Sequence, residues 1–349
     1  MARSFVQGPN QTYQLISHAI PGAPEEPDHV LVKFGAAPVN RVDVLSLTGK
    51  YPVKPKFALD GRPIPGFDGC GVVQASTSPL FSAGDVVLPR LLGQGTWRTH
   101  SVLPAASLMA PLPAGTSPLD ASLLRSGALV AWLLLEEVSR LDQGDYIMVN
   151  AGTSCVAQFL AQLARQRGVH AILVIRDREP EALAEVKERL LSLGAVAVLT
   201  EAELPVNSPR DGQHQALVGK VKLALDCVSG AIGEQMIEWL APGGKFVLVG
   251  MLAGASTGMK IRTEHLFYKQ LSFVPFRSSE VLKNLGDEKV EQIVARIAQL
   301  FIDGKLKAPQ VNTVHWENRE AVELEAALRD AVKETQDNKA GYKKTVWIY

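Results

Sequence analysis

The sequence predicts an α/β protein with two domains, and three observations support this prediction. Its 349 residues are more than one hydrophobic core usually serves. From about Ala121 onward, short strand-like runs alternate with helix-like stretches of about 10–15 residues, a pattern typical of βαβ units in a doubly wound parallel sheet. The preceding residues 1–120 are rich in Pro and Gly and contain short apolar runs, which indicates an antiparallel, partly barrel-like domain.

The expected elements follow in chain order. In the first domain, "HVLVKFGAAPVN" and "CGVVQAS" are apolar runs, and "FSAGDVVLP" is a turn followed by a strand. "DASLLRSGALVAWLLLEEV" is expected to be helical. Strands are then expected at "YIMVNAG", "AILVIRD", "AVAVLT", "VKLALDCV", "KFVLVGM" and "LSFVPF", with helices at "CVAQFLAQLARQRG", "EPEALAEVKERLLSLG" and "AIGEQMIEWLAPGG". These strands are apolar throughout, as a sheet covered on both faces requires, and "LSFVPF" is the expected edge.

The C-terminal part is expected to complete the first domain. After Ser279 comes an amphipathic helix, "EKVEQIVARIAQLFIDGKL", and then a short tail ending in "KKTVWIY". The expected domains are therefore a discontinuous one, 1–120 with 279–349, and a second one, 121–278.

The composition limits the possible partners. Lys plus Arg and Asp plus Glu balance at 36 each, which argues against a broad nucleic-acid surface or a polybasic membrane anchor. No run approaches the roughly 18 uninterrupted apolar residues of a transmembrane helix. The first twenty residues show neither a secretory apolar block nor an Arg-rich amphipathic helix, and three cysteines are too few for a disulfide framework.

A nucleotide site is expected where the first strand of the second domain ends. Asn150 and Ala151 end this strand, "GTSC" forms a loop, and a helix is expected to begin near Val156. A helix N-terminus offers unpaired N–H groups and a positive dipole end to a pyrophosphate. Only Gly152 remains of a G-x-G-x-x-G pattern, so the loop alone leaves a ligand-free βαβ unit equally open.

The end of the next strand favours NADP over NAD. NAD sites usually place an acidic residue there, whereas NADP sites place an Arg for the 2′-phosphate. This chain has Arg176 and Arg178 on either side of Asp177, and two close guanidinium groups can hold a phosphate through several fixed donors.

Metal-assisted chemistry is not expected. Zinc-dependent medium-chain alcohol dehydrogenases need a Cys in the first domain and a His–Glu pair some residues later. At comparable places this chain has Asn40 and then Phe67 with Asp68. A protein side chain must therefore manage charge and protons.

Seven motifs occur in order along essentially the whole chain: "PVNRVDVLSLTGKYPVKP", "GTWRTHSVLP", "VNAGTSCVAQ", "VIRDR", "LALDCVSG", "LVGM" and "KKTVWIY". Together they resemble the mitochondrial trans-2-enoyl-thioester reductases. These enzymes form a zinc-free branch of the medium-chain dehydrogenase/reductase superfamily. The resemblance implies a GroES-like catalytic domain and a Rossmann domain that binds NADPH. It also implies reduction of the double bond of 2-enoyl-ACP or 2-enoyl-CoA in fatty acid synthesis, a mitochondrial location (otherwise a cytoplasmic one), and a homodimer.

The resemblance also assigns residues. The family's catalytic tyrosine corresponds to Tyr51, and a family asparagine close to it corresponds to Asn40. The implied NADPH contacts are Thr153, Ser154, Cys155, Val156, Arg176, Asp177, Arg178, Gly250, Met251, Phe276, Ser278 and Lys344. A hydride acceptor of the enoyl type passes through an enolate, so Tyr51, as a protonated phenol, is expected to donate a proton or a hydrogen bond to it. Trp97 and Arg98 are expected to pack rather than react.

Five positions depart from the family pattern. Ala157 replaces a loop glycine, Gly127 an asparagine, Val249 a glycine and Arg277 a tryptophan, while Cys155 stands where Gly or Ala is usual. These departures keep two further hypotheses open, a quinone or enone reductase and an NADPH-binding sensor without catalysis. Lys50, Lys54 and Lys56 favour an acidic acyl-carrier partner, although a solvated loop explains them equally well.

Overall fold

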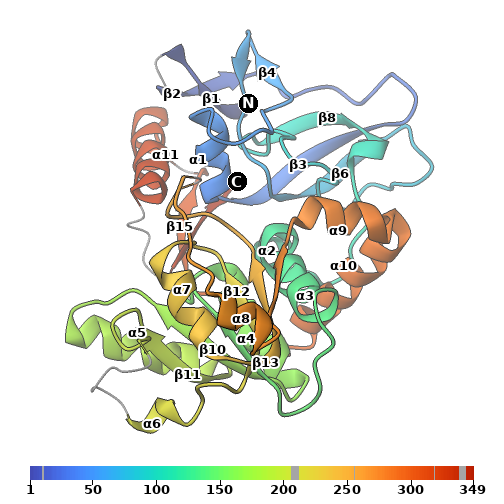
Figure 1. The fold of residues 1–349 in the computed structure, drawn as a ribbon. Helices are drawn as coiled ribbons and strands as arrows, with labels where there is room; N and C mark the ends of the chain where they lie inside the picture. The colour runs from blue at the N-terminus through green and yellow to red at the C-terminus, as the bar shows by residue number, and fades with distance from the viewer. Residues whose placement is uncertain (10–11, 206–211, 255, 318, 338–342) are drawn as a thin grey trace. The chain divides into compact units, whose positions relative to one another are not determined.

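The chain forms two compact units in a computed structural model that describes residues 1–9, 12–205, 212–254, 256–317, 319–337 and 343–349 (Figure 1). Unit 1 comprises Met1–Ser126 with Glu288–Tyr349, and unit 2 comprises Gly127–Asp287. The observed boundaries are 126/127 and 287/288, compared with the expected 120/121 and 278/279.

Unit 2 is built on a six-stranded sheet in the order β11-β10-β9-β12-β13-β14, in which all neighbouring strands are parallel. The order reverses between β9 and β12, and such a reversal opens a ligand crevice at the carboxyl ends of the strands. β14 lies at one end of the order, as expected of "LSFVPF". The strands are β9 (Tyr146–Val149), β10 (His170–Ile175), β11 (Ala195–Thr200), β12 (Val221–Asp226), β13 (Leu240–Leu248) and β14 (Ser272–Pro275).

Helices connect these strands and bury their apolar faces. The best example is α4, in which Phe159, Leu160 and Leu163 recur at helical spacing and are all buried. The helix packs on β10, so its first turn is held rigidly at the crevice. The helices are α3 (Leu129–Glu136), α4 (Cys155–Gln166), α5 (Pro180–Ser192), α6 (Gly212–Gln215), α7 (Ala231–Glu238), α8 (Thr263–Phe267) and α9 (Ser278–Leu285).

Unit 1 is mainly antiparallel. Its main sheet runs β15-β16-β3-β6-β7, with β8 also pairing with β3, and two hairpins, β1-β2 and β4-β5, accompany it. The strands are β1 (Ala2–Gln7), β2 (Tyr13–His18), β3 (His29–Pro38), β4 (Ala58–Leu59), β5 (Arg62–Pro63), β6 (Cys70–Ser76), β7 (Val86–Val87), β8 (His100–Pro104), β15 (Val311–His315) and β16 (Lys344–Ile348). The helices are α1 (Arg41–Leu47), the 3-10 turn η2 (Ala105–Ser107), α2 (Pro118–Leu123), α10 (Asp287–Ile302) and α11 (Ala321–Gln336).

Aromatic side chains form the centre of unit 1. The rings of Trp97 and Trp347 lie 4.3 Å apart, and Phe5 packs against both. Arg98 is buried with its guanidinium 4.5 Å from the Phe57 ring centroid. Trp97 therefore packs in the core, as expected from the sequence.

The expectation of a short C-terminal tail is wrong. Strand β15 and the 16-residue helix α11 lie between α10 and the final strand. The last strand, β16, pairs antiparallel with β3, which brings "KTVWI" into the main sheet of unit 1. The segment after β14 also begins with a separate helix, α9, ahead of the amphipathic α10.

The expected helix at Asp120–Val138 consists of three helical segments that follow one another without a break. α2 passes through a π-helical turn, η3 (Leu124–Ala128), into α3. Pro118–Glu136 is long and apolar enough to span a membrane by composition, but 61% of its apolar window is buried in the protein. Such burial is typical of a core helix, and in the described residues no other helix reaches this length and apolarity.

Candidate functional site

In unit 2 the candidate cofactor site lies at the reversal of the strand order. Asn150, at the end of β9, donates from Nδ2 to Asp226 Oδ1 at 2.6 Å and accepts from the Cys227 N–H at 2.6 Å. Asp226 Oδ1 also accepts from the N–H groups of Val228 and Ser229, at 2.9 and 2.8 Å. These buried bonds fix the loops that follow β9 and β12 relative to each other.

The loop before α4 is shaped by two small residues. Ala151 adopts a left-handed conformation with φ 49°, and a Cβ on Gly152 would lie 2.9 Å from the Val174 carbonyl oxygen. Ser154 is the N-cap of α4, and its hydroxyl accepts from the Ala157 N–H at 3.2 Å. The helix begins at Cys155, one residue earlier than expected. The side chains of residues 153–156 are half-buried, so the first turn is accessible to an anion.

Two of the departures from the family pattern touch each other. A Cβ on Gly127, in the π-helical turn, would lie 2.9 Å from Cys155 Sγ and 3.0 Å from the Phe159 ring. The loss of a side chain at 127 and the gain of one at 155 therefore compensate sterically. Ala157 is the third residue of α4 and is fully buried, so its Cβ packs into unit 2.

Arg176, Asp177 and Arg178 follow β10 directly. Arg178 donates to the Arg176 carbonyl at 2.7 Å, and Asp177 accepts from the Ala202 N–H at 3.3 Å. Burial and the neighbouring Arg176 both lower the pKa of Arg178, while Glu201 opposes them. Two guanidinium groups close enough to affect each other form a donor set suited to a phosphate. This donor set and the accessible α4 terminus fit an NADP-type dinucleotide.

The remaining expected contacts of unit 2 follow β13 and β14. A Cβ on Gly250 would lie 2.9 Å from the Cys227 carbonyl oxygen, so this position needs glycine. Met251 is 54% exposed. Phe276 is buried and donates its N–H to Leu248, and Ser278 opens α9.

Unit 1 contains Tyr51, just after α1. Its ring centroid lies 6.0 Å from that of the buried Phe67, with an interplanar angle of 57°. Ser46, in α1, donates to the Val53 carbonyl at 2.6 Å and so holds the other side of this loop. The Tyr51 side chain is half-buried, and in the described residues no hydrogen bond to its hydroxyl is found.

Asn40, the N-cap of α1, lies at the centre of a charged cluster in unit 1. Its Oδ1 accepts from Lys344 Nζ at 2.6 Å, and its Nδ2 donates to Asp68 Oδ2 at 3.3 Å. Lys344 also donates to the Val39 carbonyl at 2.7 Å. Arg125 Nη1 lies 3.7 Å from Asp68 Oδ1. Lys344, expected to bind the cofactor, thus also orients Asn40.

Sequence reasoning missed two buried carboxyl groups, those of Asp43 and Asp226, and named Asp68 without expecting its contact with Asn40. Asp43 accepts from the Asn40 N–H at 2.7 Å and from the Phe67 N–H at 2.8 Å. Burial raises its pKa to about 7. The bond from Asn40 opposes this shift, Asp68 adds to it, and Lys344 and the Phe67 bond oppose it. The N-x-x-D spacing of Asn40 and Asp43, a helix-start signal, could have revealed Asp43.

Asp68 and Asn40 stand at places comparable to zinc ligands in the zinc-dependent enzymes, and they are in direct contact here. Arg125 and Lys344 supply positive charge to this pair. Within the described ranges, no group of three or more His, Cys, Asp or Glu side chains is arranged to hold a metal ion.

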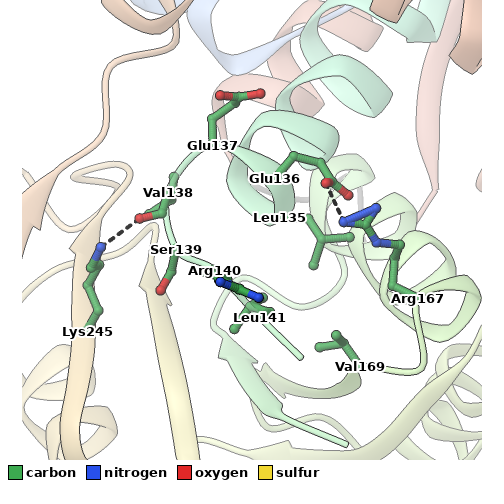
Figure 2. A pocket seen from close by; sticks show the side chains of 10 residues that line it. All are labelled: Leu135, Glu136, Glu137, Val138, Ser139, Arg140, Leu141, Arg167, Val169 and Lys245. Carbon is green, nitrogen blue, oxygen red and sulfur yellow. Dashed lines mark hydrogen bonds and ion pairs between the residues drawn. The ribbon is translucent and has the colours of Figure 1, made fainter. Parts of the chain in front are cut away.

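A separate hollow of about 370 Å³ lies near the amino ends of the strands of unit 2 (Figure 2). Lys245 donates to the Val138 carbonyl at 2.7 Å, and Arg167 pairs with Glu136 at 2.5 Å. The carboxyl ends of β9 and β12, where a dinucleotide is expected, are at the other edge of the sheet.

Comparisons with known proteins agree with this description. Two family models match the chain, "Zinc-binding dehydrogenase" over residues 155–299 and "Alcohol dehydrogenase GroES-like domain" over residues 26–114. The chain is similar to the mitochondrial enoyl-[acyl-carrier-protein] reductase of Rattus norvegicus, with 31% identity over 309 residues, covering 88% of this chain and 80% of that protein. The human enzyme of the same name is 30% identical, with the same coverage.

Solved structures extend the similarity over the full length. The Etr1p/NADP/crotonyl-CoA complex has a TM-score of 0.85 at 25% identity and covers 100% of this chain and 99% of its own. A putative NADPH:quinone reductase from Bacillus thuringiensis, at 21% identity and a TM-score of 0.76, covers 100% and 99% and shows the shared fold alone. The expected combination of a GroES-like and a Rossmann-type domain is confirmed.

Proposed function

Because the chain belongs to the family of mitochondrial enoyl-[acyl-carrier-protein] reductases, we propose that it reduces the 2,3 double bond of trans-2-enoyl thioesters with NADPH. The observation that carries this proposal is the similarity, from end to end, to the structure of Etr1p with NADP and crotonyl-CoA. The pair Arg176 and Arg178 supports it independently, since this pair suits a 2′-phosphate.

Unit 2 holds the cofactor in this proposal. The first turn of α4, with Thr153, Ser154, Cys155 and Val156, binds the pyrophosphate through N–H groups and hydroxyls. Arg176, Asp177 and Arg178 bind the adenosine end, and Gly250, Met251, Phe276 and Ser278 accompany the nicotinamide end. Lys344, in unit 1, completes the set of cofactor contacts. The bound NADPH supplies a hydride for the β-carbon of the enoyl group.

Tyr51 and Asn40, in unit 1, act on the substrate. Addition at the β-carbon moves negative charge onto the thioester oxygen and the α-carbon. Tyr51 donates its proton to the α-carbon or a hydrogen bond to the enolate oxygen, and its hydroxyl has no competing hydrogen bond within the described residues. Asn40 is held by Lys344 and Asp68 so that its amide N–H groups keep a fixed direction.

The test is the oxidation of NADPH by the purified protein with crotonyl-CoA and with a longer 2-enoyl-CoA, in parallel with NADH and with a quinone. Turnover of the enoyl thioesters with a preference for NADPH supports the proposal. Turnover of the quinone alone replaces it with the quinone reductase hypothesis. Binding of NADPH without turnover of either substrate favours a sensor.

The acyl carrier is proposed to be an acyl-carrier protein in the mitochondrion, in line with the names of the relatives. Lys50, Lys54 and Lys56 are exposed around Tyr51, and no ion pair to them is found in the described residues. Replacing all three by Glu should raise the KM for an enoyl-ACP by a larger factor than the KM for the enoyl-CoA. The matched control replaces three other exposed lysines, Lys220, Lys283 and Lys289. Equal effects of the two triple variants would refute this docking site.

A further inference from the structure

We propose that Asp43 is a positioning residue for the enoyl reduction, which ties the segment of Asn40 to the segment on which Tyr51 packs. This inference rests on the proposed function, because Asn40 and Tyr51 are the side chains assigned to it. Asp43 itself is fully buried in α1. It therefore acts through its neighbours.

The two carboxylate oxygens of Asp43 have different tasks. Oδ2 accepts from the Asn40 N–H at 2.7 Å, as an aspartate in the first turn of a helix does when it caps that helix. Oδ1 accepts from the Phe67 N–H at 2.8 Å, and Phe67 lies 24 positions further along the chain. Capping requires only the first of these bonds. The second one fixes the backbone of the Phe67 segment to the start of α1.

The hydrogen bond between the Phe67 N–H and Asp43 also fixes the Phe67 ring, which contacts Tyr51. The Phe67 ring is 1% exposed and contacts the Tyr51 ring, so its position follows from its backbone. On the other side, Ser46 of the same helix holds the loop through the Val53 carbonyl. Helix α1 thus fixes Tyr51 from both sides, and Asp43 provides the connection on the Phe67 side.

The charge state of Asp43 should control how firmly this connection holds. A carboxylate makes stronger hydrogen bonds to N–H groups than a neutral carboxyl does. The ionisable groups that face Asp43 are Asp68, Lys344 of β16 and Tyr349. Since burial raises the pKa of Asp43 to about 7, the connection is expected to weaken as the pH falls below neutrality.

The experiment compares Asp43→Asn with a core variant remote from the site, Val30→Ala, in the full-length protein. Val30 is fully buried at the opposite end of β3 from Asn40, and it serves as a control for lost stability, measured by denaturant unfolding. In Asp43→Asn the amide NH₂ can only donate, so it cannot accept from one of the two N–H groups, that of Asn40 or that of Phe67. One of the two hydrogen bonds is therefore lost. We expect kcat for crotonyl-CoA to fall about 10–100-fold, while the Kd of NADPH changes less than about twofold.

The pH profile provides a second readout. The kcat of the wild type should decline below about pH 7. The midpoint of this decline should coincide with the midpoint of the titration of the Asp43 carboxyl, measured by ¹³C NMR. The variant Asp43→Asn should lack the decline. If the variant does not fold, coincidence of the two wild-type midpoints supports the proposal and a pH-independent kcat refutes it. Equal activity losses in Asp43→Asn and Val30→Ala refute it as well. If the wild type has no enoyl reductase activity, the proposed function fails instead.

Discussion

At Asn40, two neighbours determine the orientation of the side-chain amide. Lys344 can only donate, so Oδ1 must face it, and the Asp68 carboxylate therefore meets Nδ2. A rotation of the amide by half a turn would place donor against donor and acceptor against acceptor. The remaining N–H of Asn40 is thus a preset donor, which is the kind of group that stabilises a developing enolate oxygen.

The arginine pair after β10 should determine cofactor preference. In Arg176→Ala/Arg178→Ala, we expect the KM for NADPH to rise about 10–100-fold, because hydrogen bonds to charged groups contribute about 1.5–3 kcal/mol each. The KM for NADH should stay within about twofold, since it has no 2′-phosphate. Arg140→Ala is the control, because this side chain of unit 2 is 94% exposed and distant from the end of β10 in sequence. A parallel rise for both cofactors would contradict a 2′-phosphate contact.

Asp43 should also make stability depend on pH. Its pKa in the fold, about 7, is above the ordinary value of 3.8, so the folded state holds this proton more tightly than the unfolded state does. The stabilisation is complete below about pH 4 and is lost as the pH rises through about 7. Each pKa unit corresponds to about 1.4 kcal/mol.

The free energy of unfolding, measured by urea titration at pH 5 and pH 8, checks this. Relative to Asp43→Asn, the wild type should lose stability between the two pH values. A difference that stays constant would show that Asp43 does not titrate in this range. The same charge that costs stability above neutral pH is the one that we propose to support turnover.

At the level of the elements, the π-helical turn and the start of α4 act as a pair. Gly127→Ala should destabilise the protein by about 1–3 kcal/mol, because its Cβ meets Cys155 Sγ and the Phe159 ring. Cys155→Ala should recover part of this loss, and a double-mutant cycle by denaturant unfolding measures the coupling. Additive effects would mean that the two departures from the family pattern are independent.

The elements of unit 2 could be predicted from the sequence because each carries its own signal. β10 is fully apolar over Ala171–Ile175, and α4 follows a helix cap at Ser154. In contrast, α11 has charged residues on most of its surface and only four buried positions, so its pattern did not stand out between β15 and β16. The short helix α1 was missed because it lies within a β-rich region and spans only seven residues, Arg41–Leu47.

At the scale of the whole molecule, we expect two copies of the chain to pair through strand β14. It ends the sheet of unit 2, and Phe273 and Val274 in it are only half-buried, as an edge that pairs with a second copy requires. We expect a homodimer, and Val274→Lys should shift it towards the monomer in light scattering after size-exclusion chromatography. Val322→Lys, at an exposed valine of unit 1, is the control. A dimer unaffected by Val274→Lys would place the interface elsewhere.

The candidate residues of unit 2 and those of unit 1 differ in how far the sequence alone could predict them. Arg176 could be located from the strand pattern because it directly follows an expected strand, whereas Gly250 was assigned through the resemblance to the family. The Asn40, Asp68 and Lys344 cluster joins three distant segments, and only the pairing of β16 with β3 brings Lys344 to Asn40. Such a contact depends on tertiary structure and has no signal in local sequence.

The role of Tyr51 is tested by the kcat for crotonyl-CoA with NADPH in Tyr51→Phe, measured together with the Kd of NADPH. We expect kcat to fall about 10²–10⁴-fold, the typical range for a lost general acid, while NADPH binding is unchanged. Tyr268→Phe, at a tyrosine of unit 2 that is 80% exposed, should behave like the wild type. A Tyr51→Phe variant that retains kcat within about twofold would contradict the assignment of Tyr51 as the residue that protonates or stabilises the enolate.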